Sequence, residues 1–114
     1  MPTLNEYSTH CHYASSAAGW WKDADHQTPA VKIALIHSEI SEALEGLRKD
    51  TFDDHLPHRK SIEVELVDAL IRIFDLAGRL KLDLDGAFIE KMKYNESRLD
   101  HKLETRADVG GKKF

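Results

Sequence analysis

Apolar side chains recur with a helical period over most of the chain. The most apolar stretch runs from residue 61 to 82, SIEVELVDALIRIFDLAGRLKL, and contains no proline. At about 100° per residue its apolar side chains cover most of the helix circumference. Its charged side chains form one narrow stripe at i, i+3, i+4 spacing: Glu65, Asp68, Arg72, Asp75 and Arg79. Such a helix is usually buried, so we expect arginines or a metal ion to pair with the buried acids.

A shorter helix is predicted within residues 3 to 19. Thr3 and Glu6 have the spacing of a capping box, which fixes the start of the helix. Trp20 and Trp21 then stand side by side before a polar link. Two interpretations of this pair stay open: one tryptophan caps the core, or the pair forms an aromatic wall for a flat ligand.

Two further helices complete the pattern. Thr28 followed by Pro29 predicts the start of a helix from about residue 30 to 49, because proline suits the first helical position. Another helix covers roughly residues 84 to 103, and the Gly-containing, basic tail from 104 to 114 is expected to be flexible when no ligand is present. Four helices with short connections predict an all-α, four-helix bundle in one domain that spans the whole chain.

Composition narrows the class of protein. The 114 residues carry a formal charge of −4, with no basic block until the last few residues, so we expect no duplex nucleic acid as main partner. Cys11 is the only cysteine, which excludes an intrachain disulfide and fits a reducing, cytoplasmic setting. No apolar run approaches the length of a membrane span, and the N-terminus lacks the pattern of a secretory signal. A domain this small buries a limited core, so self-association is expected.

Two acidic pairs have three-residue spacing. Glu39 and Glu42 lie in the second predicted helix, and Glu65 and Asp68 lie in the third. Residues three apart leave the same side of a helix, so the four carboxylates converge if the two helices pack antiparallel. An all-oxygen ligand set suits a hard cation such as Mg²⁺ or Mn²⁺, and Mg²⁺ commonly binds carboxylates together with substrate phosphates. The two pairs therefore predict a metal site for a phosphate-bearing substrate.

Other interpretations of the acids stay open. An E-x-x-E pair alone is usually a solvated helix face, and Arg72 and Arg79 have the i, i+4 spacing to neutralise Asp68 and Asp75 as ordinary ion pairs. On that hypothesis the protein is a non-catalytic helical oligomer, a scaffold or regulatory partner. A di-metal redox bundle would need Glu-x-x-His on two helices, and neither acidic pair has this form. The histidines are expected on the surface or in loops.

Taken together, these segments resemble the MazG-like members of the all-α nucleoside triphosphate pyrophosphohydrolase superfamily. That family is marked by E-x-x-E on one helix and E-x-x-D on the next, here Glu39/Glu42 and Glu65/Asp68. The segments AVKIALIHSEISEALEGLR and EVELVDALIRIFDLAG resemble its second and third helices. GWW, KMKYNESR and GGKKF resemble a small single-domain branch, although the tail reads RADVGG where an R-x-H-G-type approach to the final lysines is expected.

The resemblance implies a fold, a reaction and an assembly. The fold would be the MazG bundle, which oligomerises through helix packing as a homodimer or as a homotetramer built from dimers. The reaction would convert (d)NTP to (d)NMP and pyrophosphate, as house-cleaning of surplus or non-canonical deoxynucleotides. Mg²⁺ would be the cofactor, with Mn²⁺ as a substitute. Glu39, Glu42, Glu65 and Asp68 would hold the metal, or Glu39 or Glu42 would instead act on the attacking water.

The resemblance also implies where the substrate binds. Five residues of the fourth helix and the tail would bind its phosphates: Lys91, Asn95, Arg98, Lys112 and Lys113. Trp20 or Trp21 would stack on the base, since aromatic faces bind any base with little preference.

Overall fold

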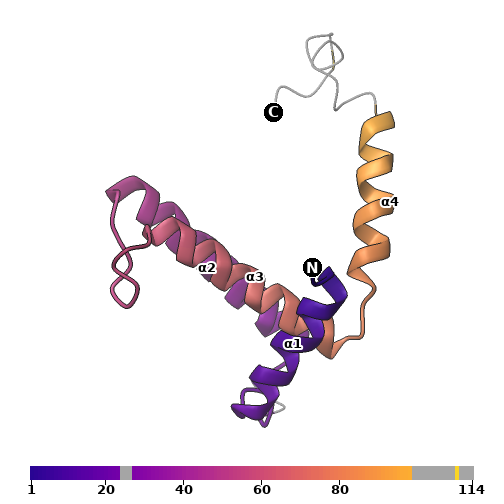
Figure 1. Cartoon of the computed structure of the whole chain (residues 1–114), viewed down its shortest axis with the longest axis horizontal. Helices are drawn as coiled ribbons and strands as arrows, with labels where there is room; N and C mark the ends of the chain where they lie inside the picture. Colours follow the sequence, from indigo (N-terminus) through magenta and orange to yellow (C-terminus); the bar gives the residue numbers. More distant parts are fainter. Residues whose placement is uncertain (24–26, 99–109, 111–114) are drawn as a thin grey trace. The chain divides into compact units, whose positions relative to one another are not determined.

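The computed structural model describes residues 1–23, 27–98 and 110, and these residues form four α-helices and no β-strand. The helices are α1 (Leu4–Ala17), α2 (Pro29–Lys49), α3 (Ser61–Arg79) and α4 (Leu84–Ser97) (Figure 1). The prediction of an all-α protein is confirmed.

The chain divides into two compact units, Met1–Leu82 and Asp83–Phe114. The first unit holds α1, α2 and α3, with α3 packed against both of the others. The second unit holds α4. The structure therefore shows one unit of three helices and one unit that holds α4, whereas the four-helix MazG bundle and the single domain stay predictions.

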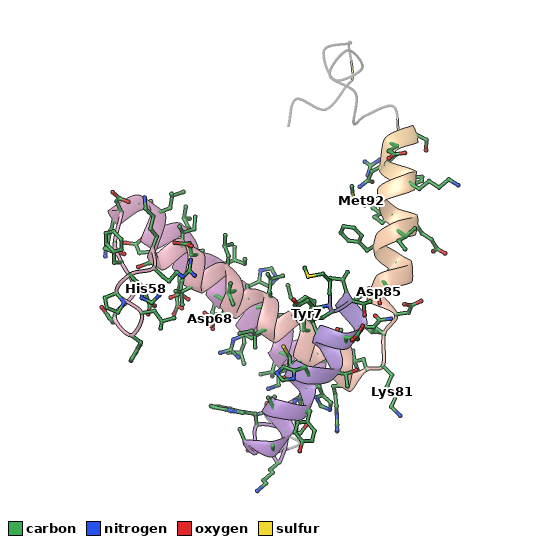
Figure 2. The ribbon with its side chains drawn as sticks, viewed as in Figure 1. Tyr7, His58, Asp68, Lys81, Asp85 and Met92 are labelled. Carbon is green, nitrogen blue, oxygen red and sulfur yellow. The ribbon has the colours of Figure 1, made fainter. Side chains whose placement is uncertain are left out.

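Helices α2 and α3 run antiparallel as a long hairpin (Figure 1). The predicted start of α2 is confirmed, because the Thr28 hydroxyl accepts a hydrogen bond from the Val31 N–H at 3.3 Å and Pro29 occupies the first turn. The helix ends at Lys49, and its C-cap residue Asp50 has left-handed backbone with φ 50°. An isolated antiparallel bridge between Phe52 and Lys60 closes the connecting loop, in which His58 lies (Figure 2). This hairpin supplies the antiparallel packing that the acidic pairs require.

Helix α1 packs on the C-terminal half of α3. Its predicted capping box is present, with Thr3 and Glu6 each accepting a hydrogen bond from the other's backbone N–H. Tyr7, labelled in Figure 2, stacks on Phe74 with ring centroids 5.5 Å apart. Helix α3 ends at Arg79 rather than at residue 82, and Lys81 follows with φ 55°. Left-handed backbone at this point stops the helix.

Gly78 permits the close approach of α1 to α3. A Cβ atom added at this position would overlap the carbonyl oxygen of Ser8 and would lie 2.6 Å from Cβ of His12. Gly78→Ala is therefore expected to lower the free energy of unfolding by roughly 1–2 kcal/mol, since overpacking outweighs the better helix propensity of alanine. Urea denaturation measures the effect. An unchanged or higher midpoint would contradict this packing of α1.

Much apolar surface of the hairpin stays exposed in the single chain. The buried apolar residues are mostly small: Ala43, Ala69, Leu76 and Ala77. Large apolar side chains of α2 and α3 are about half exposed: Ile33, Ile40, Leu44, Leu47, Leu66, Val67, Leu70, Ile71 and Ile73. The prediction that α3 is buried all round is thus wrong for one chain, because two neighbouring helices cover only part of its circumference. Among the described residues, no helix combines the length and apolarity needed to cross a membrane.

Helix α4 is shorter than predicted within the described residues. The Asp83 carboxylate caps its start by accepting the Gly86 N–H at 3.1 Å. The helix ends at Ser97, and Arg98 has extended backbone. The remainder of the predicted helix, residues 99–103, lies outside the described residues.

Candidate functional site

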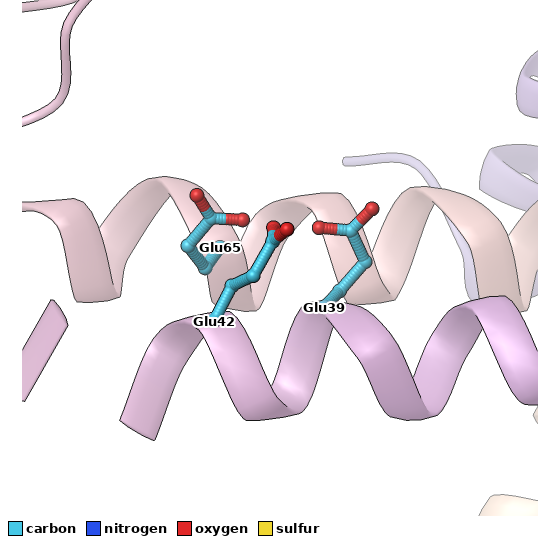
Figure 3. A group of neighbouring side chains, drawn as sticks. All are labelled: Glu39, Glu42 and Glu65. Atoms are coloured by element: carbon cyan, nitrogen blue, oxygen red, sulfur yellow. The ribbon is translucent and has the colours of Figure 1, made fainter. Parts of the chain in front are cut away.

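Three of the four predicted acids converge at the middle of the hairpin. Glu39 and Glu42 leave α2 one turn apart, and Glu65 leaves α3 opposite them (Figure 3). One carboxylate oxygen of each residue lies within 4.8 Å of the others. The convergence follows from the i, i+3 spacing and the antiparallel packing of α2 and α3.

Asp68 stands slightly apart from this group of three. It lies one turn further along α3 (labelled in Figure 2) and faces a cavity together with Glu39. Burial, and then the charge of Glu39, raises the pKa of the Asp68 carboxyl above its ordinary value. The charge of Arg72 opposes these two effects without outweighing them, so a nearby cation would further stabilise the ionised carboxylate.

Glu65 has the most strongly shifted pKa of the group. Burial and the hydrogen bonds shared with Glu39 and Glu42 raise the pKa of Glu65 to about 7. Its Oε2 atom is buried without a hydrogen-bond partner among the described residues. A buried carboxylate oxygen without a partner costs free energy, and a divalent cation would satisfy it. The three acids thus fit a hard cation by ligand type and by this orphaned atom.

Arg72 binds Glu39 rather than an acid on its own helix. Its Nε donates to Oε1 of Glu39 at 2.8 Å, which joins α3 to α2. Burial opposes ionisation of Glu39, but hydrogen bonds, first that from Arg72, outweigh burial and hold the pKa of Glu39 below its ordinary value. Glu39 therefore ionises more readily than Glu65, whose pKa is raised to about 7.

Asp75 is bound by residues of α1 and of the segment that follows it. It is 7% exposed, and its Oδ1 accepts both the His12 Nδ1–H and the Trp21 Nε1–H at 2.9 Å. The described residues do not form the alternative Arg79–Asp75 ion pair, because the packing of α1 brings other donors to the carboxylate. His12 is therefore half-buried and not a surface residue as expected. Its position on the face of α1 that packs on α3 is the one sequence feature that could have indicated this burial.

The two tryptophans have different surroundings. Trp21 is held inside the unit, since Lys32 Nζ lies 4.4 Å and Arg79 Cζ 5.1 Å from its ring centroid, in addition to the bond with Asp75. Trp20 is 63% exposed and lines the cavity that Glu39 and Asp68 face. Of the two predicted base-binding residues, Trp20 is the one whose ring is open to a ligand.

This cavity of about 550 Å³ is open to solvent and is lined by residues of α1, of the segment after it, and of α2 and α3. Its volume is within the range of small-ligand sites. Its aromatic and charged lining includes Trp20, Lys32, Glu39, Asp68, Arg72 and Asp75. The cavity thus joins two of the predicted metal-binding acids to the exposed tryptophan. Lys32 had no signal in the sequence, because a lysine on a helix normally points into solvent.

The predicted phosphate-binding residues lie elsewhere in the chain. Lys91 and Asn95 are on α4, and Arg98 follows it, where both cations lie near the ring of Tyr94. Because α4 and the acids belong to different units of the chain, the approach of these residues to the acids stays a prediction. Lys112 and Lys113 lie outside the described residues.

The raised pKa of Glu65 makes the stability of the metal-free protein depend on pH. The folded-state pKa of about 7 exceeds the ordinary 4.5, so the folded protein is stabilised by protonation of Glu65. This stabilisation is complete below pH 4.5 and is lost as pH rises through 7. Glu65→Gln mimics the protonated carboxyl at every pH, so the variant should not lose this stabilisation as pH rises. In EDTA, the melting temperature of the variant minus that of the wild type is expected to grow by roughly a few degrees from about pH 5.5 to 8. A constant difference would contradict the raised pKa of Glu65.

Comparison with protein-family models, curated proteins and solved structures found no match to this chain. The geometry of the acids, the cavity and the resemblance of the motifs are therefore what point to a function.

Proposed function

We propose that the protein is a Mg²⁺-dependent nucleoside triphosphate pyrophosphohydrolase of the MazG-like kind. The observation that carries the proposal is the convergence of Glu39, Glu42 and Glu65 beside a cavity that an exposed aromatic ring also lines. The substrate would be a (d)NTP, with phosphates toward the acids and base toward Trp20.

The four acids share one task in this proposal, and one of them has a second task. Glu39, Glu42, Glu65 and Asp68 would hold the cation through their carboxylate oxygens. A Mg²⁺ ion held there would offset the charge of the phosphates and would make the attacking water more acidic. Water attacks phosphorus, the bond between the α- and β-phosphates breaks, and pyrophosphate leaves the nucleoside monophosphate. Glu42 suits the role of proton acceptor better than Glu39, because Arg72 keeps the basicity of Glu39 low.

A product-resolved assay tests the reaction. The protein is incubated with each dNTP and Mg²⁺, with and without excess EDTA, and the products are separated by ion-exchange chromatography. Pyrophosphate and dNMP are expected, and only without EDTA. Release of orthophosphate, or no turnover by a protein with native circular dichroism, would overturn the proposal.

We also propose that two copies associate through the exposed apolar faces of α2 and α3. Residues such as Leu47 and Val67 are more than half exposed in one chain, and burial of apolar surface drives association. Sedimentation velocity at micromolar concentration is expected to show a dimer or a dimer of dimers. A monomer under these conditions would contradict the proposal.

The Glu39–Arg72 ion pair favours one competing function, a non-catalytic helical oligomer whose acids serve only structural pairing. That hypothesis predicts the same melting temperature with and without Mg²⁺ and dNTP. An upward shift would count against it, because a ligand that binds the folded state alone stabilises it.

A further inference from the structure

Two cations face the same cavity as the acids. Lys32 of α2 is only 6% exposed, although lysine is almost never buried without a partner. Its Nζ lies over the ring of Trp21, and it forms no ion pair among the residues that the structure describes. Among the described residues, the direct contact of its charge is thus with the aromatic face of Trp21.

Arg72 of α3 has N–H donors in this cavity beyond the one that binds Glu39. Its guanidinium carries five N–H groups, and the bond to Glu39 uses Nε. The side chain is 37% exposed and lines the cavity together with Lys32. The remaining donors can therefore bind a second acceptor while Nε stays on Glu39.

The two cations also act on each other. Burial lowers the pKa of Lys32 most, Asp75 opposes this effect, and the charge of Arg72 lowers the pKa further. Among the described residues no ion pair joins Asp75 to Lys32, so Asp75 acts on the Lys32 charge without direct contact. An anion placed between Lys32 and Arg72 would relieve both the burial and the repulsion.

We propose that Lys32 and Arg72 form a phosphate-binding subsite in the cavity, next to the acids that would hold the metal. The inference rests on the proposed function and adds the residues that grip the substrate's phosphate chain. Lys32 supplies a point charge, and Arg72 supplies a fork of donors. Glu39, Asp68 and Asp75 line the same cavity, so phosphate binding requires that Mg²⁺ first offset their charge.

Calorimetric titration of the full chain with inorganic tripolyphosphate tests the subsite without any base or reaction. In the presence of excess Mg²⁺, Lys32→Met and Arg72→Gln are each expected to weaken binding by about tenfold or more, the usual effect of losing a charged hydrogen bond. Mg²⁺ alone should bind Lys32→Met as it binds the wild type, and should bind Arg72→Gln at least as tightly, because Glu39 is released. Without Mg²⁺, binding of tripolyphosphate should be lost.

Matched controls remove the same charges from the solvent face of α2. Arg48 and Lys49 are 71% and 66% exposed, so Arg48→Gln and Lys49→Met should change tripolyphosphate affinity less than about twofold at constant ionic strength. The subsite is refuted if the cavity variants bind like these controls, or if the folded wild type does not bind tripolyphosphate. Binding that depends on both cations, in a protein that hydrolyses no dNTP, would refute the proposed function and keep the subsite.

Discussion

Glu65→Gln is expected to lower dNTP turnover by at least about 100-fold. Loss of a residue that only orients a metal ligand typically costs about 10–100-fold, and loss of a ligand itself should cost at least as much. Glu65 is the acid of α3 that meets both Glu39 and Glu42, and its Oε2 has no other partner among the described residues. Glutamine keeps the size of the side chain but cannot carry the charge that a cation needs. Turnover by chromatographic assay and Mg²⁺ binding by calorimetry should fall together.

The control for this variant is Glu45→Gln. Glu45 lies one turn beyond Glu42 on α2, is half exposed and pairs with Lys49 at 3.0 Å. Its replacement should leave turnover and Mg²⁺ binding within about twofold, since exposed pairs contribute little. If Glu65→Gln kept the activity of Glu45→Gln while both remained folded, the carboxylates at the middle of the hairpin would not be the metal site.

Asp75→Ala is expected to lower the free energy of unfolding by about 2–4 kcal/mol, because it removes two hydrogen bonds to a buried charge and leaves both donors unpaired. The donors come from His12 and Trp21, so the variant loosens α1 and the segment after it from α3. Denaturation in urea measures the loss. It should appear with and without Mg²⁺, since Asp75 belongs to the packing of α1.

Two comparison variants isolate this effect. Asp75→Asn keeps an acceptor oxygen and should cost less than the alanine variant. Asp54→Ala removes an exposed loop acid and should change stability by no more than about 0.5 kcal/mol. Equal stability of Asp75→Ala and Asp54→Ala would contradict the buried network.

The local signals predicted the helices well. The capping box of Thr3 and Glu6 and the Thr28–Pro29 start are both present, because a cap depends on residues within one turn. The end of α3 was predicted too late, because its left-handed backbone falls on Lys81, and a lysine gives no sequence signal for a conformation that usually takes glycine. The burial of α3 was overestimated. Periodicity shows which faces of a helix are apolar, but it does not show how many neighbouring helices one chain provides to cover them.

By itself, the sequence determined that this chain is helical and that α2 and α3 each present acids on one side. Both properties follow from spacing along a single helix, and the short connection between the helices favours antiparallel packing. Only the tertiary structure decided how the charged stripe of α3 is partnered. Arg72 reaches Glu39 on α2, and Asp75 receives its donors from His12 and Trp21, because these partners are distant in sequence and meet only when three helices pack. The cavity with Lys32 in its wall arises from the same packing, so no pattern in one segment encodes it.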